Sequence, residues 1–99
     1  IIIERNYRCY LGEIDIIAKD GNILVFVEVK SRRSCKFGMP QEAVGTKKQK
    51  KISMIAMFYL HEKNLSDVNA RFDIVAVYID SGAPFVELIR DAFDLHPGY

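Results

Sequence analysis

The fold is decided by Gly12-Glu13-Ile14-Asp15-Ile16-Ile17-Ala18 and Val25-Phe26-Val27-Glu28-Val29-Lys30, two stretches in which charged groups alternate with residues that favour strands. Side chains two positions apart on a strand point the same way, so Glu13 and Asp15 share a face, as do Glu28 and Lys30. The opposite faces are apolar and carry Ile14, Ile16, Ala18, Val27 and Val29. The pattern therefore predicts two strands of a sheet that hold their charges on one face.

A turn signal, Asp20-Gly21-Asn22, separates the two stretches and predicts an antiparallel hairpin. If Gly21-Asn22 is the loop, Asp15 lies opposite Glu28 and Glu13 lies opposite Lys30. If Asp20-Gly21 is the loop, Asp15 and Glu28 are diagonal neighbours instead. Like charges that face each other across two strands destabilise a sheet unless something compensates them. A divalent cation would provide that compensation.

The rest of the chain predicts a mixed α/β fold in a single domain that spans residues 1–99. A strand at about 4–9 and strands at about 12–19 and 23–32 form an antiparallel meander. A loop at 34–45, with a short helical turn at 41–44, leads to an amphipathic helix at about 47–62. Thr46 and Gln49 match a capping box at its start, and Ile52, Ile55, Ala56, Tyr59 and Leu60 recur at helical spacing.

The second half of the chain predicts further strands on the same sheet. A strand at 71–79 follows the helix, and the order strand, helix, strand predicts a right-handed crossover beside the hairpin. A turn at 80–84 and a strand at 85–89 come next. Residues 91–99 are predicted to be a loosely held tail.

Composition and motifs exclude several classes of protein. No apolar run approaches the ~20 residues of a membrane span, and Ile1-Ile2-Ile3 is too short and wrongly flanked for a signal peptide. We therefore expect a cytoplasmic protein. Cys9 and Cys35 lack the C-x-x-C spacing of zinc ribbons, so they are interpreted as packed thiols, and His61 and His96 as surface residues.

Basic residues gather in two places although the net charge is only +1. Lys30, Arg32, Arg33 and Lys36 follow the second acidic strand, and Lys47, Lys48, Lys50 and Lys51 lie at the start of the helix. The helix macrodipole disfavours cations at that end, which hints at a partner, although solubility alone could explain them. A single run of charge is usually solvated surface. Two runs beside one acidic site favour contacts with the phosphates of a nucleic acid.

The charged face has the groups needed for metal-assisted phosphodiester hydrolysis. Asp15 and Glu28 offer hard oxygen ligands for Mg²⁺ or Mn²⁺, and the backbone carbonyl of Val29 could be a third ligand. Lys30 could orient the attacking water or stabilise charge in the transition state.

Four segments in series carry a family resemblance: residues 12–18, 26–32, 47–49 and Arg71-Phe72-Asp73-Ile74-Val75. Together they resemble the YraN family of uncharacterised bacterial proteins, which is similar to PD-(D/E)XK nucleases and especially to archaeal-type Holliday junction resolvases. The resemblance implies a restriction-endonuclease-like core that cleaves branched or structured DNA with Mg²⁺ or Mn²⁺. It places Asp15, Glu28 and Lys30 at the positions of the catalytic Asp, Glu and Lys.

The chain departs from that family at its start. In the family, a helix before the first strand carries a further acidic residue that helps to bind metal, and this sequence begins too late to contain it. Without that helix an apolar sheet face is expected to be exposed, which favours a homodimer or strand exchange. The missing acidic residue also bears on whether the chain cuts DNA.

Several residues have more than one interpretation. Glu13 could assist the metal or form a salt bridge with Lys30 or Arg32, and Gln49 could lie near the site or act only in the capping box. Arg71 and Asp73 are predicted to pair structurally. Two other functions stay open: a noncatalytic nucleic-acid-binding or assembly module with the same fold, and a purely structural interaction domain.

Overall fold

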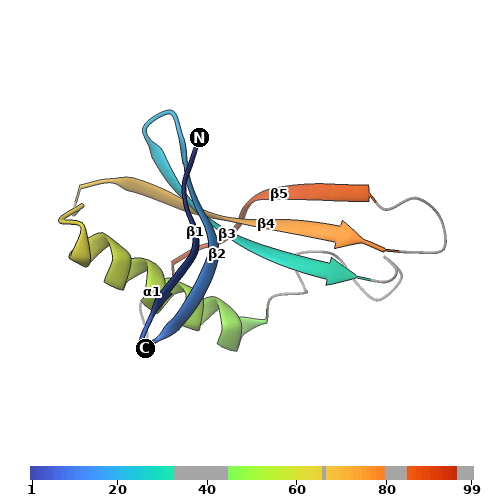
Figure 1. Cartoon of the computed structure of the whole chain (residues 1–99), viewed down its shortest axis with the longest axis horizontal. Helices are drawn as coiled ribbons and strands as arrows, with labels where there is room; N and C mark the ends of the chain where they lie inside the picture. Colours follow the sequence, from blue (N-terminus) through green and yellow to red (C-terminus); the bar gives the residue numbers. More distant parts are fainter. Residues whose placement is uncertain (33–44, 66, 80–84, 96–99) are drawn as a thin grey trace.

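The computed structural model describes residues 1–32, 45–65, 67–79 and 85–95, which form one sheet and one helix (Figure 1). The elements are β1 (Ile2–Cys9), β2 (Gly12–Asp20), β3 (Ile23–Arg32), α1 (Thr46–Glu62), β4 (Asn69–Tyr78) and β5 (Phe85–Phe93). The predictions for the loop at 34–44, the turn at 80–84, Arg33, Cys35, Lys36 and His96 lie outside the described residues.

The five strands follow chain order across the sheet, β1-β2-β3-β4-β5. All neighbours are antiparallel except β3 and β4, which run parallel on either side of α1 in the chain. The mixed sheet, its antiparallel meander and the crossover helix are therefore confirmed. Asp20 pairs with Ile23, so Gly21-Asn22 is the two-residue loop of the β2–β3 hairpin, as one of the two predicted registers required.

The core lies between α1 and one face of the sheet. Tyr59 of the helix packs edge-on against Tyr7 of β1 and Phe26 of β3, with ring centroids 5.0 and 5.9 Å apart. Phe26 stacks on Phe72 of β4, which stacks on Phe93 of β5. Removal of these rings from water drives the helix onto the sheet. The predicted helical stripe is buried as expected, except that Leu60 is only partly buried.

The start of α1 differs from the capping-box prediction. The helix begins at Thr46 itself, and Gly45 is its N-cap without a side-chain capping bond. The amide of Gln49 donates to the Gly45 carbonyl at 2.9 Å, which is the first bond of the helix ladder. Because Thr46 already lies inside the helix, its hydroxyl is one position too late to cap it.

The last strand is longer than the sequence predicted, because β5 continues to Phe93 instead of ending at residue 89. Asp91 adopts a positive φ of 51°, and the pairing with β4 shifts register between Ile89 and Phe93. The Asp91 amide donates to the carboxylate of Asp73 at 2.9 Å, which holds the irregular turn against β4. Residues 91–93 are therefore part of the sheet, and the loosely held tail was predicted too early.

The alternation of core-facing and outward-facing residues along β2 is broken at one place. Ile14 and Ile17 are both fully buried in the core beneath α1, whereas Ile16 and Ala18 line a cavity on the other face. The prediction that Ile14 shares a face with Ile16 and Ala18 is therefore wrong. The hydrogen-bonded ladder between β2 and β3 ends at the pair of Ile16 and Val27. β2 therefore bends away from β3 at the place where the alternation is broken.

The face of the sheet opposite α1 is partly open and carries both apolar side chains and charged ones. Ile2 of β1 and Leu88 of β5 are about half exposed there, at 47% and 50%. In the described ranges α1 is the single helix, and it packs on the other face of the sheet. The homodimer that the open face favours stays a prediction.

Gly12→Ala is expected to destabilise the fold by about 1–3 kcal/mol, because Gly12 has a φ of 142° that residues with a Cβ avoid. An added Cβ would also lie 3.1 Å from Cδ1 of Ile55. Chemical denaturation would measure the loss. Gly21→Asn is the control, since Gly21 has a φ of 62°, which Asn tolerates, and open space around it. Equal effects in the two variants would contradict this account.

Candidate active site

The site forms where β2 leaves β3. The backbone ladder stops after Ile16 and Val27, and in its place the amide of Val29 donates to Oδ2 of Asp15 at 2.8 Å. The Asp15 side chain therefore points toward β3. This is the stretch on which the register with a Gly21-Asn22 loop places Asp15 opposite Glu28. One carboxylate oxygen is used in this bond, which fixes the orientation of the other.

Glu28 is the buried carboxylate of the site, with 7% of its surface exposed. Its Oε2 lies 3.6 Å from Nζ of Lys48 and 3.9 Å from Nζ of Lys30. Burial raises the pKa of Glu28 above its usual range, and the negative charge of Asp15 raises it further. The two lysines act in the opposite direction without cancelling the rise. A divalent cation would relieve the repulsion that remains between the carboxylates.

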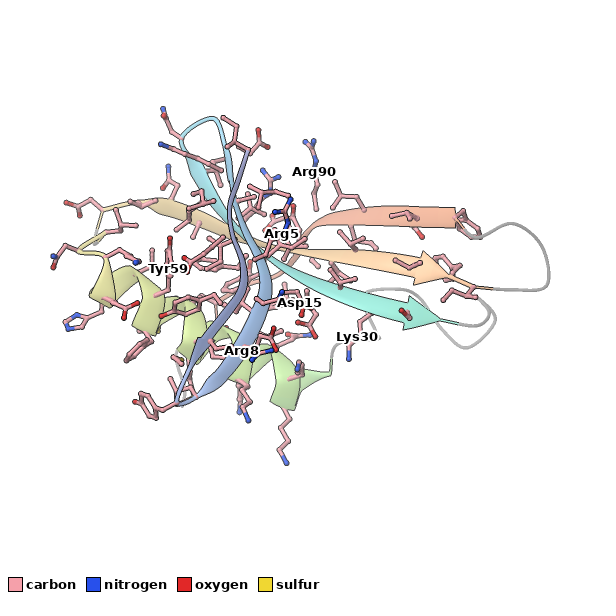
Figure 2. All side chains as sticks on the ribbon, in the orientation of Figure 1. Arg5, Arg8, Asp15, Lys30, Tyr59 and Arg90 are labelled. Carbon is pink, nitrogen blue, oxygen red and sulfur yellow. The ribbon has the colours of Figure 1, made fainter. Side chains whose placement is uncertain are left out.

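A cavity of about 210 Å³ brings these groups together beneath the first turns of α1. Its lining comes from β2, β3 and the helix, and consists of Gly12, Glu13, Asp15, Glu28, Lys48, Lys51, Ile52 and Ile55. Figure 2 shows Asp15 near the crossing of the strands and Lys30 farther along β3, toward the end of that strand. Lys48 and Lys51, predicted only as phosphate contacts, therefore line the same cavity as the acids.

Glu13 pairs with β1 and not with Lys30, and the side chain of Arg32, the other partner considered, lies outside the described residues. The Oε1 of Glu13 lies 3.7 Å from Nε of Arg8, its partner on β1, and Lys30 approaches Glu28 instead. The reason is again the bend in β2, which keeps Glu13 paired with β1 after β3 has diverged. Glu13 still lines the cavity, so an accessory role toward metal stays a prediction.

The other predicted site residues are more dispersed. Lys47 and Lys50 are exposed on α1, and Gln49 is partly buried. Arg32 ends β3, and its side chain is outside the described structure, as is all of Arg33. Val29 contributes its amide to Asp15. Its carbonyl as a metal ligand stays a prediction.

A second charged cluster lies on the opposite face of the sheet. The Nε of Arg71 donates to Oδ1 of Asp73 at 3.0 Å, and Nη1 of Arg71 donates to Oδ2 of Asp20 at 2.9 Å. The predicted structural pairing of Arg71 with Asp73 is confirmed. The contact with Asp20 has no signature in the sequence, because the Arg71 side chain must reach from β4 past β3 to the end of β2.

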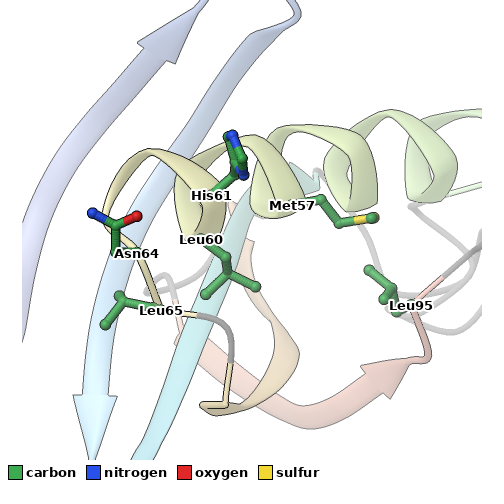
Figure 3. A pocket seen from close by; sticks show the side chains of 6 residues that line it. All are labelled: Met57, Leu60, His61, Asn64, Leu65 and Leu95. Carbon is green, nitrogen blue, oxygen red and sulfur yellow. The ribbon is translucent and has the colours of Figure 1, made fainter.

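An apolar cavity lies at the other end of α1 and contains none of the predicted site residues (Figure 3). It is lined by Met57, Leu60, His61, Asn64, Leu65 and Leu95, with a volume of about 390 Å³. His61 is exposed, as predicted. Cys9 is a free thiol packed partly against the core.

The Asp15–Glu28 pair fits the donor set of a magnesium site. Within the described ranges no group of three or more His, Cys, Asp or Glu side chains could hold a metal ion. Mg²⁺, however, is often bound by one or two carboxylates, with waters and substrate phosphates completing its shell. No helix in the same ranges is long and apolar enough to cross a membrane.

Comparison with known proteins identifies the family. The model of the uncharacterised protein family UPF0102 matches residues 1–77. The chain belongs to this family. A UPF0102 protein of Syntrophus aciditrophicus (strain SB) is 60% identical over 97 residues, covering 98% of this chain and 76% of the relative. One from Geobacter sulfurreducens is 54% identical over 95 residues, covering 95% and 74%.

These matches confirm the resemblance to the YraN family that the sequence motifs indicated. The region matched by the UPF0102 model contains every residue that lines the cavity between β2, β3 and α1. The cavity is therefore built entirely from the part of the chain that defines the family.

Proposed function

We propose that this UPF0102 protein is a metal-dependent endonuclease that hydrolyses phosphodiester bonds in branched or structured DNA. The observation that carries the proposal is the pairing of Asp15 with the buried Glu28 in a cavity that Lys48 and Lys51 also line, with Lys30 beside it. The reaction class comes from the resemblance of the D…E-x-K pattern to PD-(D/E)XK nucleases. The mixed sheet, with its meander and crossover helix, is compatible with a restriction-endonuclease-like core.

Asp15 and Glu28 are the proposed ligands of Mg²⁺ or Mn²⁺, with the Val29 carbonyl as a third. The bound ion would polarise the scissile phosphate and neutralise charge that develops during hydrolysis. The bond from the Val29 amide holds Asp15 in place before the ion arrives, so little reorganisation is needed. The burial of Glu28 excludes water from one side of the site and strengthens its attraction for a cation.

Lys30 is the proposed assistant to the attacking water. It lies two positions after Glu28 on β3, and its Nζ is 3.9 Å from Oε2 of that residue. Its side chain is 36% exposed, so the ammonium group can reach both the carboxylates and a phosphate at the cavity mouth. A compact, mobile charge suits this role.

The proposed DNA-contacting surface consists of Lys47, Lys48, Lys50 and Lys51 on α1 with Arg32 and Arg33 after β3. The helix lysines are exposed at the end of α1 where the macrodipole disfavours them, and the first turn of the helix itself contains no acidic residue. Phosphates would neutralise this charge, and such contacts position DNA without reading its sequence.

One observation favours the alternative of a noncatalytic nucleic-acid-binding or assembly module. Within the described ranges the two carboxylates are not joined by a third ligand side chain at metal-binding distance. A domain of this kind would keep the lysines and lose turnover. It predicts that DNA binding weakens when the helix lysines are removed and is unaffected when Asp15 is removed.

The test is to soak crystals of the protein with MnCl₂ and to assay cleavage of a four-way junction and a flap in the same metal. The proposal expects an ion between Asp15 and Glu28 together with cutting. Junction binding without an ion and without cutting across a broad panel of substrates would instead establish the binding module.

A further inference from the structure

Among the residues that the structure describes, Lys48 is the basic group closest to the buried carboxylate of the candidate site. Its Nζ lies 3.6 Å from Oε2 of Glu28, nearer than that of Lys30, and Lys48 lines the cavity whereas Lys30 does not. The Glu28 side chain is 8% exposed and that of Lys48 is 46% exposed. One end of this ion pair is therefore fixed inside the protein, and the other can move into water.

The position of Lys48 in the helix is unfavourable except for this contact. It is the third residue of α1, where the free amide groups of the first turn carry a partial positive charge. A lysine there is repelled by the helix terminus and by Lys47, Lys50 and Lys51 nearby. Glu28 is the compensating anion that the structure provides.

We infer that Lys48 is an internal counter-cation that neutralises Glu28 until a divalent cation displaces it. The inference rests on the proposed function, because it requires a metal ion between Asp15 and Glu28. An ion held by the carboxylates of Asp15 and Glu28 would repel an ammonium group that lies 3.6 Å from Oε2 of Glu28. The half-exposed lysine is the partner that can leave, so metal binding releases its Nζ from the carboxylate toward the cavity mouth.

This displacement couples the metal to the rest of the site. Binding free energies are linked reciprocally. The factor by which Lys48 lowers the affinity for the metal ion is therefore the factor by which the bound ion lowers the equilibrium constant of the Lys48–Glu28 ion pair. The released ammonium group becomes available to a phosphate oxygen. Lys48 thereby acts as a positioning residue that ties metal occupancy to the charge presented to DNA.

The experiment measures Mn²⁺ affinity by isothermal titration calorimetry for wild type, Lys48→Met, Lys48→Arg and Lys50→Met. Lys48→Met removes the competitor and should bind Mn²⁺ about five- to tenfold more tightly. Lys48→Arg keeps a charge that pairs strongly with carboxylates and should bind no more tightly than wild type. Lys50→Met removes an exposed charge from the same helix and should change affinity little.

Two results would overturn the inference. If Lys48→Met binds Mn²⁺ no more tightly than wild type, the lysine does not compete for the site. If Lys50→Met gains as much Mn²⁺ affinity as Lys48→Met, the effect is only long-range electrostatics. In both cases wild-type binding still supports the proposed metal centre. If no protein binds Mn²⁺, including wild type, the proposed metal centre fails and the inference fails with it.

Discussion

Asp73→Ala is expected to lower the free energy of unfolding by about 3–5 kcal/mol, the range for removing one partner of a buried ion pair. Asp73 is 3% exposed and accepts hydrogen bonds from the Nε of Arg71 at 3.0 Å and from the amide of Asp91 at 2.9 Å. The substitution leaves the Arg71 guanidinium, whose side chain is 17% exposed, without its inner partner. Urea denaturation with the m-value held constant would measure the loss.

The control for this prediction is Asp20→Ala, which removes the outer partner of the same arginine. The Asp20 side chain is 52% exposed, and exposed ion pairs contribute little to stability, so this variant should lose much less. Hydrogen exchange would add a local readout, because loss of the Asp73 carboxylate frees the Asp91 amide and the end of β5. If Asp73→Ala and Asp20→Ala destabilise the protein equally, the buried half of the network is not what stabilises the fold.

The fold was predictable wherever one local rule acted alone. Alternation and the Gly21-Asn22 turn predicted the β2–β3 hairpin, and helical spacing predicted the buried stripe of α1 that includes Ile52 and Ile55. The parallel pairing of β3 and β4 followed from the strand, helix, strand order. The hairpin and the helical stripe are each decided by residues close together in the chain, and the parallel pairing is decided by the order of the elements.

Prediction failed wherever a distant contact overrode the local rule. Ile14 entered the core because β2 turns toward β1 after its ladder with β3 ends. β5 continued past Asp91 because Asp73, on another strand, bonds the amide of a residue with positive φ. Neither event has a signature in the residues that immediately surround it.

The candidate site divides in the same way. The spacing of Asp15, Glu28 and Lys30 was evident in the sequence, because strand parity and the hairpin register place them together. The proximity of Lys48 to Glu28 was not, because it depends on how α1 crosses the sheet. From the sequence, the lysines of α1 were therefore interpreted as surface charge, although Lys48 and Lys51 line the cavity.

Lys30→Met is expected to lower kcat for Mn²⁺-dependent cleavage of a four-way junction by about 10²–10⁴-fold, the contribution typical of a positioned group that assists proton transfer. Lys30 lies beside Glu28 at 3.9 Å but outside the cavity lining, so Mn²⁺ should still bind to the variant. Single-turnover cleavage, measured together with calorimetric Mn²⁺ binding, separates these two effects.

Asp15→Asn is the matched variant, because it should abolish both cleavage and Mn²⁺ binding. The side-chain carbonyl of the substituted asparagine can still accept the hydrogen bond that the Val29 N–H donates to Oδ2 of Asp15. The backbone there is therefore expected to be preserved. What is lost is the negative charge opposite Glu28. If Lys30→Met cleaves at the wild-type rate while Asp15→Asn is inactive, the metal alone organises the attacking water and Lys30 is only a neighbour of Glu28. If both variants bind junctions normally and wild type never cleaves, charge on α1 rather than the carboxylate pair accounts for function.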